Sequence, residues 1–438
     1  MATQVEDHLV ESIDASSVAL DASNVDAVID RVSGHSIVLL GEATHGTHEF
    51  YALRAEITKR LVTEHNFNAI AVEADWPDAY RVNCFVRCRG SDDDAISALA
   101  SFTRFPRWMW RNEVIEDLVG WLREHNSSRK PEEEVGFYGL DLYSLHRSID
   151  AVLSYLSERD PDAAARARER YACFSAFGED SQAYGYAAST GRVETCEDDV
   201  VRQLIDLRSR GTSPGDDPDD RFFVERNAIL IKNAERYYRE MFRGSVSSWN
   251  LRDMHMTDTL EALHDHIGRH AEPRIVVWEH NSHLGDARAT QMGRAGEVNV
   301  GQLVRKRFGG RSFALGFTTF SGSVTAASNW DAPAELKRVR PALEESYEWL
   351  LHQAGIGAFL LPLSDRRLSD ALAGPRLERA IGVIYRPETE RASHYFHASL
   401  PGQFDAIVHV DSTRALRPLD EVSGWSDRDL AETYPHAV

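Results

Sequence analysis

Short runs of consecutive apolar residues alternate along the chain with segments whose apolar residues recur every three or four positions. The first run, Ile37–Leu40, has the length and composition of a strand that is buried on both faces. Gly41 ends this run, and residues 50–64 then show the spacing of an amphipathic helix. Further buried runs, each predicted to be a strand, occupy residues 69–72, 135–140, 274–278, 313–317, 358–361, 381–385 and 406–410.

Alternating strands and helices predict an α/β fold with a mostly parallel central sheet flanked by helices. The alternation stops after the third strand, and the pattern up to the fourth strand is helical, which predicts a large helical insertion. The last strands lack long helical spacers and could pair antiparallel. We therefore divide the chain into an N-terminal lead-in (1–35), a first part of the α/β core (36–143), a helical lobe (144–270) and a second part of the core (271–438).

Four of the predicted strands end in polar, titratable residues. The carboxyl ends of parallel strands lie at one edge of a sheet, where α/β proteins bind their ligands. We therefore expect these residues to meet in one cleft, to which the Glu279 carboxylate would add charge. The residues are Glu42 and His45 after the first strand, Glu73 and Asp75 after the second, Asp141 after the third, and Glu279, His280 and His283 after the fourth.

Composition narrows the range of partners. The 438 residues include 69 acidic and 49 basic side chains, for a net charge of −20. Such a surface repels phosphate backbones and anionic lipids, so nucleic acids and membranes are poor partners and a small-molecule substrate is favoured. The four cysteines show no disulfide framework and are read as reduced. With no apolar signal segment at the N-terminus and no run long enough to cross a membrane, a cytoplasmic protein is expected, and the sequence does not indicate its oligomeric state.

Several common catalytic motifs are absent from the sequence. It contains no Gly-x-Ser-x-Gly elbow, no phosphate-binding loop and no convincing dinucleotide fingerprint. His48–Glu49 begins a zinc-protease motif, but Ala52 stands where its second histidine should be. Histidines and carboxylates remain as the candidates for chemistry.

These residues allow two mechanisms. In the first, His45 is a general base that takes a proton from water, which attacks a carbonyl carbon. Glu42 or Glu73 would orient the imidazole of His45 and stabilise its charged form, as the acid of a catalytic triad does. His280 or His283 would polarise the carbonyl or protonate the leaving oxygen.

In the second mechanism, His45, His48, His280, His283 and an acid hold a divalent metal whose bound water attacks. Arg54 shares a helix face with Phe50 and could keep Glu42 or Glu73 ionised, bind a substrate oxygen, or form an ordinary surface pair. The tryptophans Trp76, Trp108 and Trp110 could line an apolar pocket or pack in the core.

Three blocks of sequence, taken in order, resemble the erythromycin esterase family. They are residues 41–50 (GEATHGTHEF), 72–76 (VEADW) and 277–286 (VWEHNSHLGD), and residues 248–254 (SWNLRDM) and 378–387 (ERAIGVIYRP) also match the family. The resemblance runs from about Ile37 to the C-terminus. It implies a central sheet with a helical lobe, and a hydrolase that opens macrolide lactones, the basis of antibiotic resistance, with a histidine-activated water and no required cofactor.

By this resemblance, His45 would be the base, Glu42 and Glu73 the supporting acids, Arg54 a cleft residue, and His280 and His283 the partners across the cleft. We take Arg54, Asp75, Trp76 and His48 as the substrate-binding candidates. The prediction is thus a cytoplasmic hydrolase of a carboxylic ester or lactone. The alternative is a metal- or small-molecule-binding protein of the same fold without esterase activity, and in either case the helical lobe could bind a partner or serve as a lid.

Overall fold

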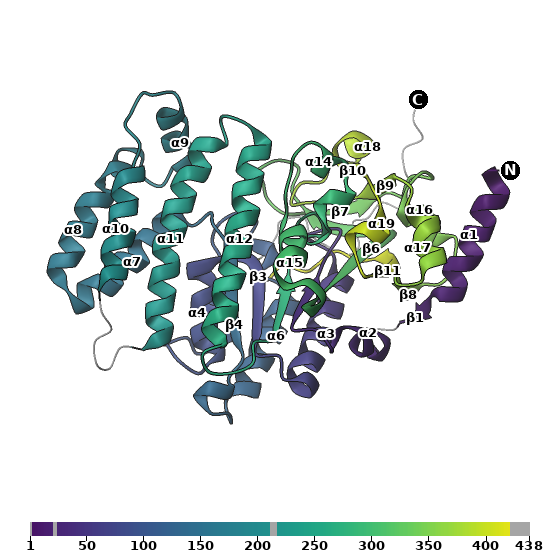
Figure 1. Cartoon of the computed structure of the whole chain (residues 1–438), viewed down its shortest axis with the longest axis horizontal. Coiled ribbons are helices and arrows are strands. Elements are labelled where there is room, and N and C mark those ends of the chain that lie inside the picture. Colours follow the sequence, from purple (N-terminus) through teal and green to yellow (C-terminus); the bar gives the residue numbers. More distant parts are fainter. Residues whose placement is uncertain (1, 21–23, 211–216, 421–438) are drawn as a thin grey trace.

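A nine-stranded sheet forms the centre of the protein (Figure 1). The computed structural model describes residues 2–20, 24–210 and 217–420. Eight of the sheet's strands follow the order β1 (Val18–Ala19), β8 (Ala358–Pro362), β11 (Ala406–Thr413), β6 (Ser312–Ala326), β2 (Ile37–Leu40), β5 (Ile275–Trp278), β3 (Ala69–Asp75) and β4 (Gly136–Asp141). Every neighbouring pair from β11 to β4 is parallel. This arrangement confirms the predicted α/β class with a mostly parallel sheet, and it places the carboxyl ends of β2 to β5 at one edge.

The antiparallel pairs lie outside this parallel block. Strand β8 runs antiparallel to both β1 and β11, and β7 (Glu335–Val339) pairs antiparallel with β6. Strands β9 (Arg376–Arg379) and β10 (Tyr395–Ala398) form a separate two-stranded sheet that the apolar pattern did not predict. The strand predicted at residues 381–385 is wrong, because this segment makes only isolated bridges and its apolar residues Ile381 and Tyr385 fill a small core with Val324.

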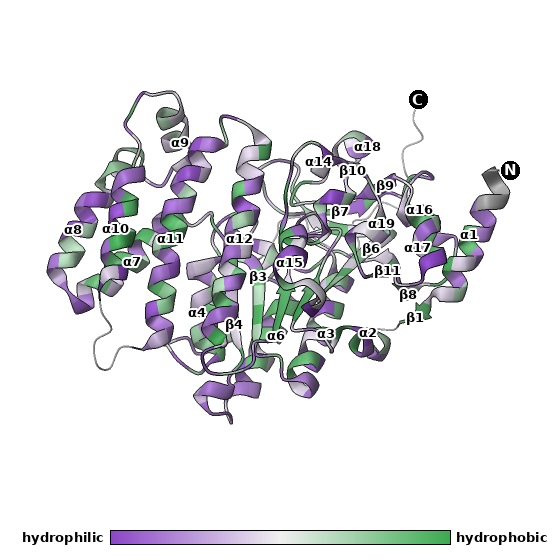
Figure 2. Ribbon diagram, viewed as in Figure 1, coloured by the Kyte–Doolittle hydropathy of each residue, from purple (hydrophilic) through white to green (hydrophobic). Residues whose placement is uncertain are grey.

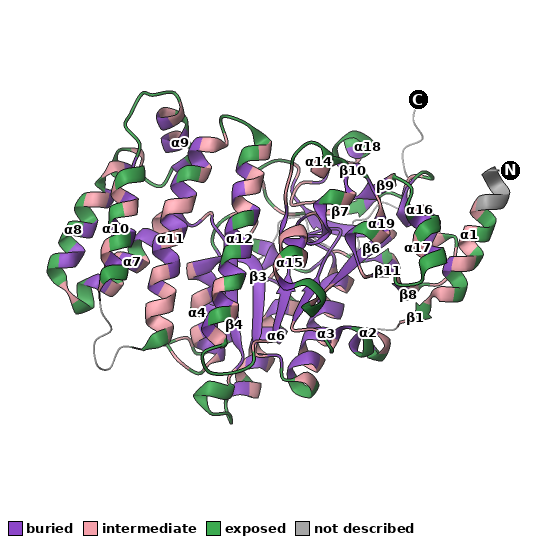
Figure 3. Cartoon of the chain, in the orientation of Figure 1, coloured by how far each residue is buried: buried purple, intermediate pink, exposed green. Residues whose placement is uncertain are grey.

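The two faces of the sheet are buried by different helices. Along β2, Val38 and Leu40 belong to the core shared with α3 (His48–His65) and α6 (Glu113–Asn126). Ile37 and Leu39 point to the other face and belong to the core shared with α11 (Pro218–Glu240) and α12 (Ser245–Ile267). Figures 2 and 3 show the result, in which the central strands are apolar and buried while the outer sides of the helices are polar and exposed.

A run of helices separates β4 from β5. It comprises α7 (Leu145–Arg159), α8 (Pro161–Tyr171), α9 (Ser181–Ser189), α10 (Glu197–Ser209), α11 (Pro218–Glu240) and α12 (Ser245–Ile267). Helices α7 to α11 gather to one side, and α12 lies between them and the sheet (Figure 1). The four-part division of the chain stays a prediction.

One expectation about the cysteines is wrong. Cys173 and Cys196 form a disulfide, with their Cα atoms 6.0 Å apart, while Cys84 and Cys88 are free. The bonded pair is 23 residues apart in sequence and meets only because α8 to α10 fold together, so its spacing gives no local signal. The cysteine pattern therefore no longer supports a reducing compartment. Within the described ranges, no helix is both long and apolar enough to cross a membrane.

The remaining helices complete the layers and edges. On the side of α3 these are α2 (Asp26–Val32), α4 (Trp76–Val86) and α5 (Ala95–Leu99). After β5 come α13 (Asn281–Leu284), α14 (Gln291–Arg294), α15 (Val300–Phe308), α16 (Tyr347–His352), α17 (Arg366–Leu372), α18 (Glu390–Ser393) and α19 (Leu400–Gln403). Helix α1 (Ala2–Ser16) lies beside α16 and α17 at the opposite end of the molecule from α8 (Figure 1).

Candidate active site

Two glycines let the turn after β2 approach its neighbours closely. A Cβ atom on Gly41 would lie 2.1 Å from Oδ1 of Asn281, and one on Gly46 would lie 1.9 Å from the carbonyl oxygen of Thr325. The backbone N–H of Asn281 donates to the carbonyl of Glu42 at 2.8 Å. This hydrogen bond joins the ends of β2 and β5, which the sequence predicted to meet at one edge of the sheet.

His45 is oriented by a chain of buried side chains. Its Nδ1 lies 2.8 Å from Oε1 of Glu42, and the other oxygen of Glu42 accepts a hydrogen bond from Arg54. Arg54 is fully buried, with its guanidinium carbon 4.4 Å from the ring centre of Tyr51 and 4.6 Å from that of Trp278. Arg54 therefore holds Glu42 from behind and does not line the cavity, so the expectation that it binds substrate is replaced by a positioning role.

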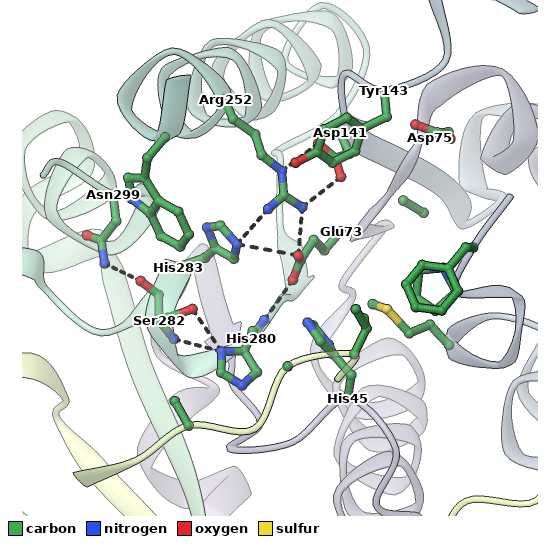
Figure 4. A pocket seen from close by; sticks show the side chains of 18 of the residues that line it. His45, Glu73, Asp75, Asp141, Tyr143, Arg252, His280, Ser282, His283 and Asn299 are labelled. Atoms are coloured by element: carbon green, nitrogen blue, oxygen red, sulfur yellow. Dashed lines mark hydrogen bonds and ion pairs between the residues drawn. The ribbon is translucent and has the colours of Figure 1, made fainter. Parts of the chain in front are cut away.

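The ring of His280 lies next to that of His45, with the ring centres 4.8 Å apart (Figure 4). Its Nδ1 accepts from the backbone N–H of Ser282 at 3.2 Å and from the Ser282 hydroxyl at 2.8 Å. Burial, reinforced by the neighbouring His45, lowers the pKa of His280 to about 3. A neutral imidazole that accepts at Nδ1 carries its proton on Nε2. That Nε2 is buried and makes no hydrogen bond of good geometry among the described residues, although the backbone of Ala43 makes a weaker hydrogen-bond contact with the ring.

Glu73 lies at the centre of a charged network. Its Oε1 is 2.8 Å from Nη2 of Arg252 and 3.4 Å from Nε2 of His283, and its Oε2 accepts the backbone N–H of His280 at 3.0 Å (Figure 4). Burial alone would favour the protonated acid. The charges of His283, His45 and Arg252 outweigh it and hold the pKa of Glu73 well below its usual range. Glu73 is therefore an ionised anchor rather than a proton carrier.

His283 differs sharply from His280. Its Nδ1 lies 2.9 Å from Oδ2 of Asp253, and its ring stacks on Trp249 with centres 4.5 Å apart. Although burial disfavours a charged imidazole, Asp253 and Glu73 raise the pKa of His283 to about 10. Its two N–H groups then donate to Asp253 and Glu73. Nη1 of Arg252 lies 3.1 Å from Nε2 of His283. Both side chains are cations that bind Glu73 and neither nitrogen can accept a proton, so this contact is not a hydrogen bond.

Arg252 links the ends of β3 and β4. It binds Asp141 through two parallel hydrogen bonds, of 2.9 Å from Nε and 2.8 Å from Nη2, in addition to Glu73. Sequence reasoning missed Arg252, Asp253 and Trp249 as site residues because they lie in the middle of helix α12 rather than at a strand end. The available signal was their i, i+3, i+4 spacing, which places them on one helix face.

These groups surround a cavity of about 510 Å³. Its wall includes His45, Glu73, Asp75, Asp141, His280 and His283 together with Trp110, Trp249 and Trp330. Glu42 stands behind His45, outside the wall. The wall does not contain Trp108, whose side chain is buried, and of the four substrate-binding candidates it contains only Asp75.

Besides Arg54, the candidates that lie outside the wall are Trp76 and His48. Trp76 is buried against Tyr138 and Phe223, where its Nε1 donates to the Phe223 carbonyl at 3.2 Å, so its pocket role is corrected to core packing. His48 begins α3, and its backbone N–H donates to Arg414. Its absence from the wall breaks up the proposed four-histidine metal set. In the described parts of the chain, no three His, Cys, Asp or Glu side chains are grouped to hold a metal ion.

Glu279 does not add the charge that the sequence suggested. It is 1% exposed, and neither carboxyl oxygen has a hydrogen-bond partner among the described residues. Burial raises its pKa well above the usual range and so favours the neutral, protonated form. It packs behind the cavity instead of facing it.

Two known proteins are similar to this chain in sequence. The chain is 22% identical over 311 residues to erythromycin esterase type II of Escherichia coli, covering 66% of this chain and 70% of that one. It is 21% identical over 343 residues to YbfO of Bacillus subtilis (strain 168), covering 74% of each.

Two solved structures share the fold. A Bacillus cereus protein superposes with a TM-score of 0.79 at 18% identity, covering 95% of this chain and 99% of that one. A mutant of the erythromycin esterase EreC in its open conformation gives 0.68 at 18% identity, covering 92% and 97%.

The sequence model named Erythromycin esterase matches residues 62–413. The match begins after His45 and Glu42, so their assignment depends on the geometry described above. It nevertheless spans most of the 438 residues, and the chain belongs to the erythromycin esterase family.

Proposed function

We propose that this protein hydrolyses a carboxylic ester or lactone with a water molecule activated by His45. One observation carries the proposal: the Arg54–Glu42–His45 chain ends at a cavity that the ring of the adjacent, neutral His280 also lines. A base that is held by an acid, next to a neutral hydrogen-bond donor, is the pairing that acyl transfer to water requires.

Glu42 bonds to Nδ1 of His45, which leaves Nε2 as the nitrogen available to a water in the cavity. The water oxygen adds to the carbonyl carbon while its proton moves to Nε2 of His45, and Glu42 stabilises the imidazolium that forms. The negative charge develops on the carbonyl oxygen, where the Nε2–H of His280 stabilises it. When the C–O bond to the leaving alcohol breaks, His45 returns the proton to that oxygen, so one ester and one water give one acid and one alcohol.

The charged network around Glu73 prepares this geometry and does not transfer protons. Glu73 fixes the backbone N–H at His280, and Arg252 and His283 keep Glu73 ionised. His283 holds its proton with a pKa of about 10 between two acids, so it is a poor acid for the leaving group. Of the two histidines proposed to face the carbonyl, we therefore assign that role to His280.

The substrate class follows from the chemistry of the site and the family. A cavity of about 510 Å³ accommodates a drug-sized molecule. The name of the Escherichia coli relative makes macrolide lactones one class to test, as the resemblance implied. The mechanism uses side chains of the protein alone, so we propose that no cofactor is required.

The decisive experiment incubates the purified protein with a panel of esters and lactones, macrolides included, and follows the addition of one water molecule by mass spectrometry. His45→Asn is the control, because asparagine keeps a polar side chain but cannot take up a proton at neutral pH. Hydrolysis by the unmodified protein that persists after chelation supports the proposal. If ligands bind by calorimetry but none is hydrolysed, the protein is a small-molecule-binding member of the family instead.

A further inference from the structure

A disulfide fixes the start of helix α10 in the helical lobe. Cys196 directly precedes α10 and is fully buried, whereas its partner Cys173 lies in a short 3₁₀ helix (Ala172–Phe177) and is half-buried. The segment that leads to Cys196, residues 190–195, is exposed along its whole length. Packing therefore contributes little to holding this segment, and the covalent bond to Cys173 keeps its end in place.

Tyr184 of helix α9 connects the disulfide to helix α11. Its hydroxyl accepts the backbone N–H of Cys196 at 2.9 Å and donates to Oε1 of the buried Glu235 of α11 at 2.6 Å. Its ring packs edge-on against Phe174, the residue after Cys173, with the ring centres 4.9 Å apart. The chain on both sides of the disulfide thus contacts the same tyrosine, which joins it to α11.

Helix α9 packs closely against α11 (Figure 1), and α11 in turn contacts the cavity wall. A Cβ atom on Gly185 of α9 would lie 2.1 Å from the carbonyl oxygen of Tyr238 of α11. The hydroxyl of Tyr238 donates to the carbonyl of Tyr143 at 3.1 Å, and Tyr143 lines the cavity. The guanidinium carbons of Arg252 and Arg104 lie 4.8 and 4.9 Å from the centre of the Tyr143 ring. A continuous set of contacts therefore runs from the disulfide to the cavity wall.

Thiol–disulfide exchange with a dithiol can open this bond. An attacking thiolate has access to Cys173, which is half-buried, and not to the fully buried Cys196. The thiolate bonds to Sγ of Cys173, and the electron pair of the broken S–S bond leaves on Sγ of Cys196, which then takes up a proton. The second thiol of the dithiol attacks the mixed disulfide and releases Cys173 as a thiol. Two electrons have then passed from the dithiol, which leaves as a disulfide, to the two cysteines.

From these observations we propose that the Cys173–Cys196 disulfide is a reversible redox control of the cavity. With the bond closed, α9 is held against α11, and Tyr238 supports Tyr143 in the wall. With the bond opened by a dithiol, the exposed segment before α10 is released, α9 loosens from α11, and the wall at Tyr143 loses this support.

The control acts on the cavity wall and not on the reacting groups. His45 and His280 follow β2 and β5, outside this set of contacts, so the chemical step itself should change little. The kinetic part of this inference rests on the proposed hydrolase function, and its structural part does not.

The first test needs no substrate. The folded protein is incubated with dithiothreitol, and a thiol count after denaturation should rise from the two free cysteines to all four. Amide hydrogen exchange is then compared between the oxidised and reduced proteins by mass spectrometry. On reduction, we expect exchange to become about tenfold faster in residues 181–190 and about threefold faster in residues 142–147, while β5 is unchanged. The inference is overturned if dithiothreitol does not reduce the folded protein, or if residues 142–147 exchange equally fast in both states.

The second test compares small and large esters. The substrates are para-nitrophenyl acetate and the para-nitrophenyl esters of phenylalkanoic acids of increasing length, so that the longer acyl groups reach the wall at Tyr143. On reduction, we expect the ratio of kcat/KM for the best long ester to that for the acetate to fall by about three- to tenfold, mainly through KM. This is the effect of losing about one hydrogen-bond contact. A ratio that is the same in both redox states contradicts the inference.

Two variants test whether the effect depends on the disulfide and on the contacts described above. Cys173→Ser combined with Cys196→Ser should show the low ratio of the reduced protein and no response to dithiothreitol. Tyr238→Phe keeps the disulfide but removes the hydrogen bond to the carbonyl of Tyr143. In this variant, reduction should still speed exchange in α9 but should no longer change the ratio.

Tyr186→Phe is the matched control for Tyr238→Phe. It removes a tyrosine hydroxyl from the exposed side of α9, where the side chain is 44% exposed, and should keep the full response to reduction. If Tyr238→Phe responds to dithiothreitol as strongly as Tyr186→Phe, the disulfide does not act on the cavity through Tyr238 and the inference is rejected.

Failure of the proposed hydrolase function would look different, because none of the esters would be cleaved in either redox state. In that case, hydrogen exchange tests the inference alone. Faster exchange in residues 142–147 on reduction that is lost in Tyr238→Phe supports redox control of the wall. Faster exchange confined to residues 181–190 shows that the disulfide only stabilises the lobe, and it rejects the inference.

Discussion

The His45–His280 pair and the Glu73 network lie in the same cavity but use their charges differently. His280 has one ring nitrogen without a hydrogen bond of good geometry among the described residues, and His45 directs one toward the cavity. In the network, Arg252 pairs with Glu73 and Asp141, and His283 pairs with Glu73 and Asp253. His280 and His283 are only three residues apart, yet their pKa values move in opposite directions, to about 3 and about 10. The difference fits the proposed mechanism, in which His45 and His280 react and the paired charges of the network hold them in place.

The largest effect is expected on the His45–His280 side. His45→Asn removes the proton acceptor and should lower kcat by roughly 10²–10⁴-fold, the usual contribution of a general base. Because the asparagine side chain can still donate to Glu42, the circular dichroism spectrum and the unfolding midpoint should stay close to those of the unmodified protein. Activity of the purified variant within tenfold of the unmodified protein would remove His45 from the mechanism.

The next largest effect should appear when the network loses its cation. Arg252→Met leaves Glu73 and Asp141 buried without that partner, which should lower the free energy of unfolding by about 3–5 kcal/mol. Urea unfolding measures this change. Arg202→Met is the matched control, because Arg202 pairs with Asp198 and Asp199 at the surface with its side chain 63% exposed, and should cost less than about 1 kcal/mol. Equal losses in the two variants would show that the network is no stronger than a surface pair.

The pH dependence of stability should separate the two histidines. Folded His283 keeps its proton up to about pH 10, whereas an unfolded histidine loses it near 6.5. Its contribution to the free energy of unfolding is therefore fully present below pH 6.5 and is lost as the pH rises toward 10. Folded His280 stays neutral down to about pH 3, so its contribution is present above 6.5 and is lost as the pH falls toward 3.

Single substitutions show which histidine causes the loss of stability at each end of the pH range. His283→Gln should flatten the alkaline side of the stability curve, and His280→Gln the acid side, each by up to about 1.4 kcal/mol per pH unit. The measurement is urea unfolding at a series of pH values. If both variants flatten the same side, the opposite assignments of the two rings are wrong.

The smallest effect should come from Ser282→Ala. This change removes the hydroxyl at 2.8 Å from Nδ1 of His280 but keeps the backbone N–H at 3.2 Å, so the ring retains one anchor. We expect kcat to fall by about three- to tenfold with KM nearly constant, since one hydrogen bond contributes about 1 kcal/mol. A change confined to KM would instead indicate that Ser282, which lines the cavity, contacts substrate directly.

The sequence predicted those features that short-range patterns determine. Runs such as Ile37–Leu40 are buried on both faces, and the residues directly after them meet because parallel strands share an edge. Such patterns do not predict the direction in which an individual side chain points. Trp76 comes directly after Asp75, yet Asp75 lines the cavity while Trp76 turns toward Phe222 and Phe223 of α11. Which way such a residue points depends on the packing of α4 against helices more than 140 residues later.

The same limit explains why part of the site was missed. Arg252 and Asp253 lie in the middle of a long helix, and only the docking of α12 beside β4 brings them to Glu73 and His283. Charges at that spacing usually form a solvated face. Their burial beside oppositely charged strand ends is a tertiary fact that no local spacing encodes.

Helix α12 belongs to the stretch of chain between β4 and β5, yet it supplies Trp249 and Arg252 to the cavity wall and Asp253 to the network behind it. A chimera that borrows this stretch from a distant relative must therefore choose its junction with care. A splice ahead of Ser245 exchanges α7 to α11 and retains the native partners of Glu73 and His283. A splice beyond Ile267 transplants part of the reaction centre, and the donor helix must then bring its own matching arginine and aspartate.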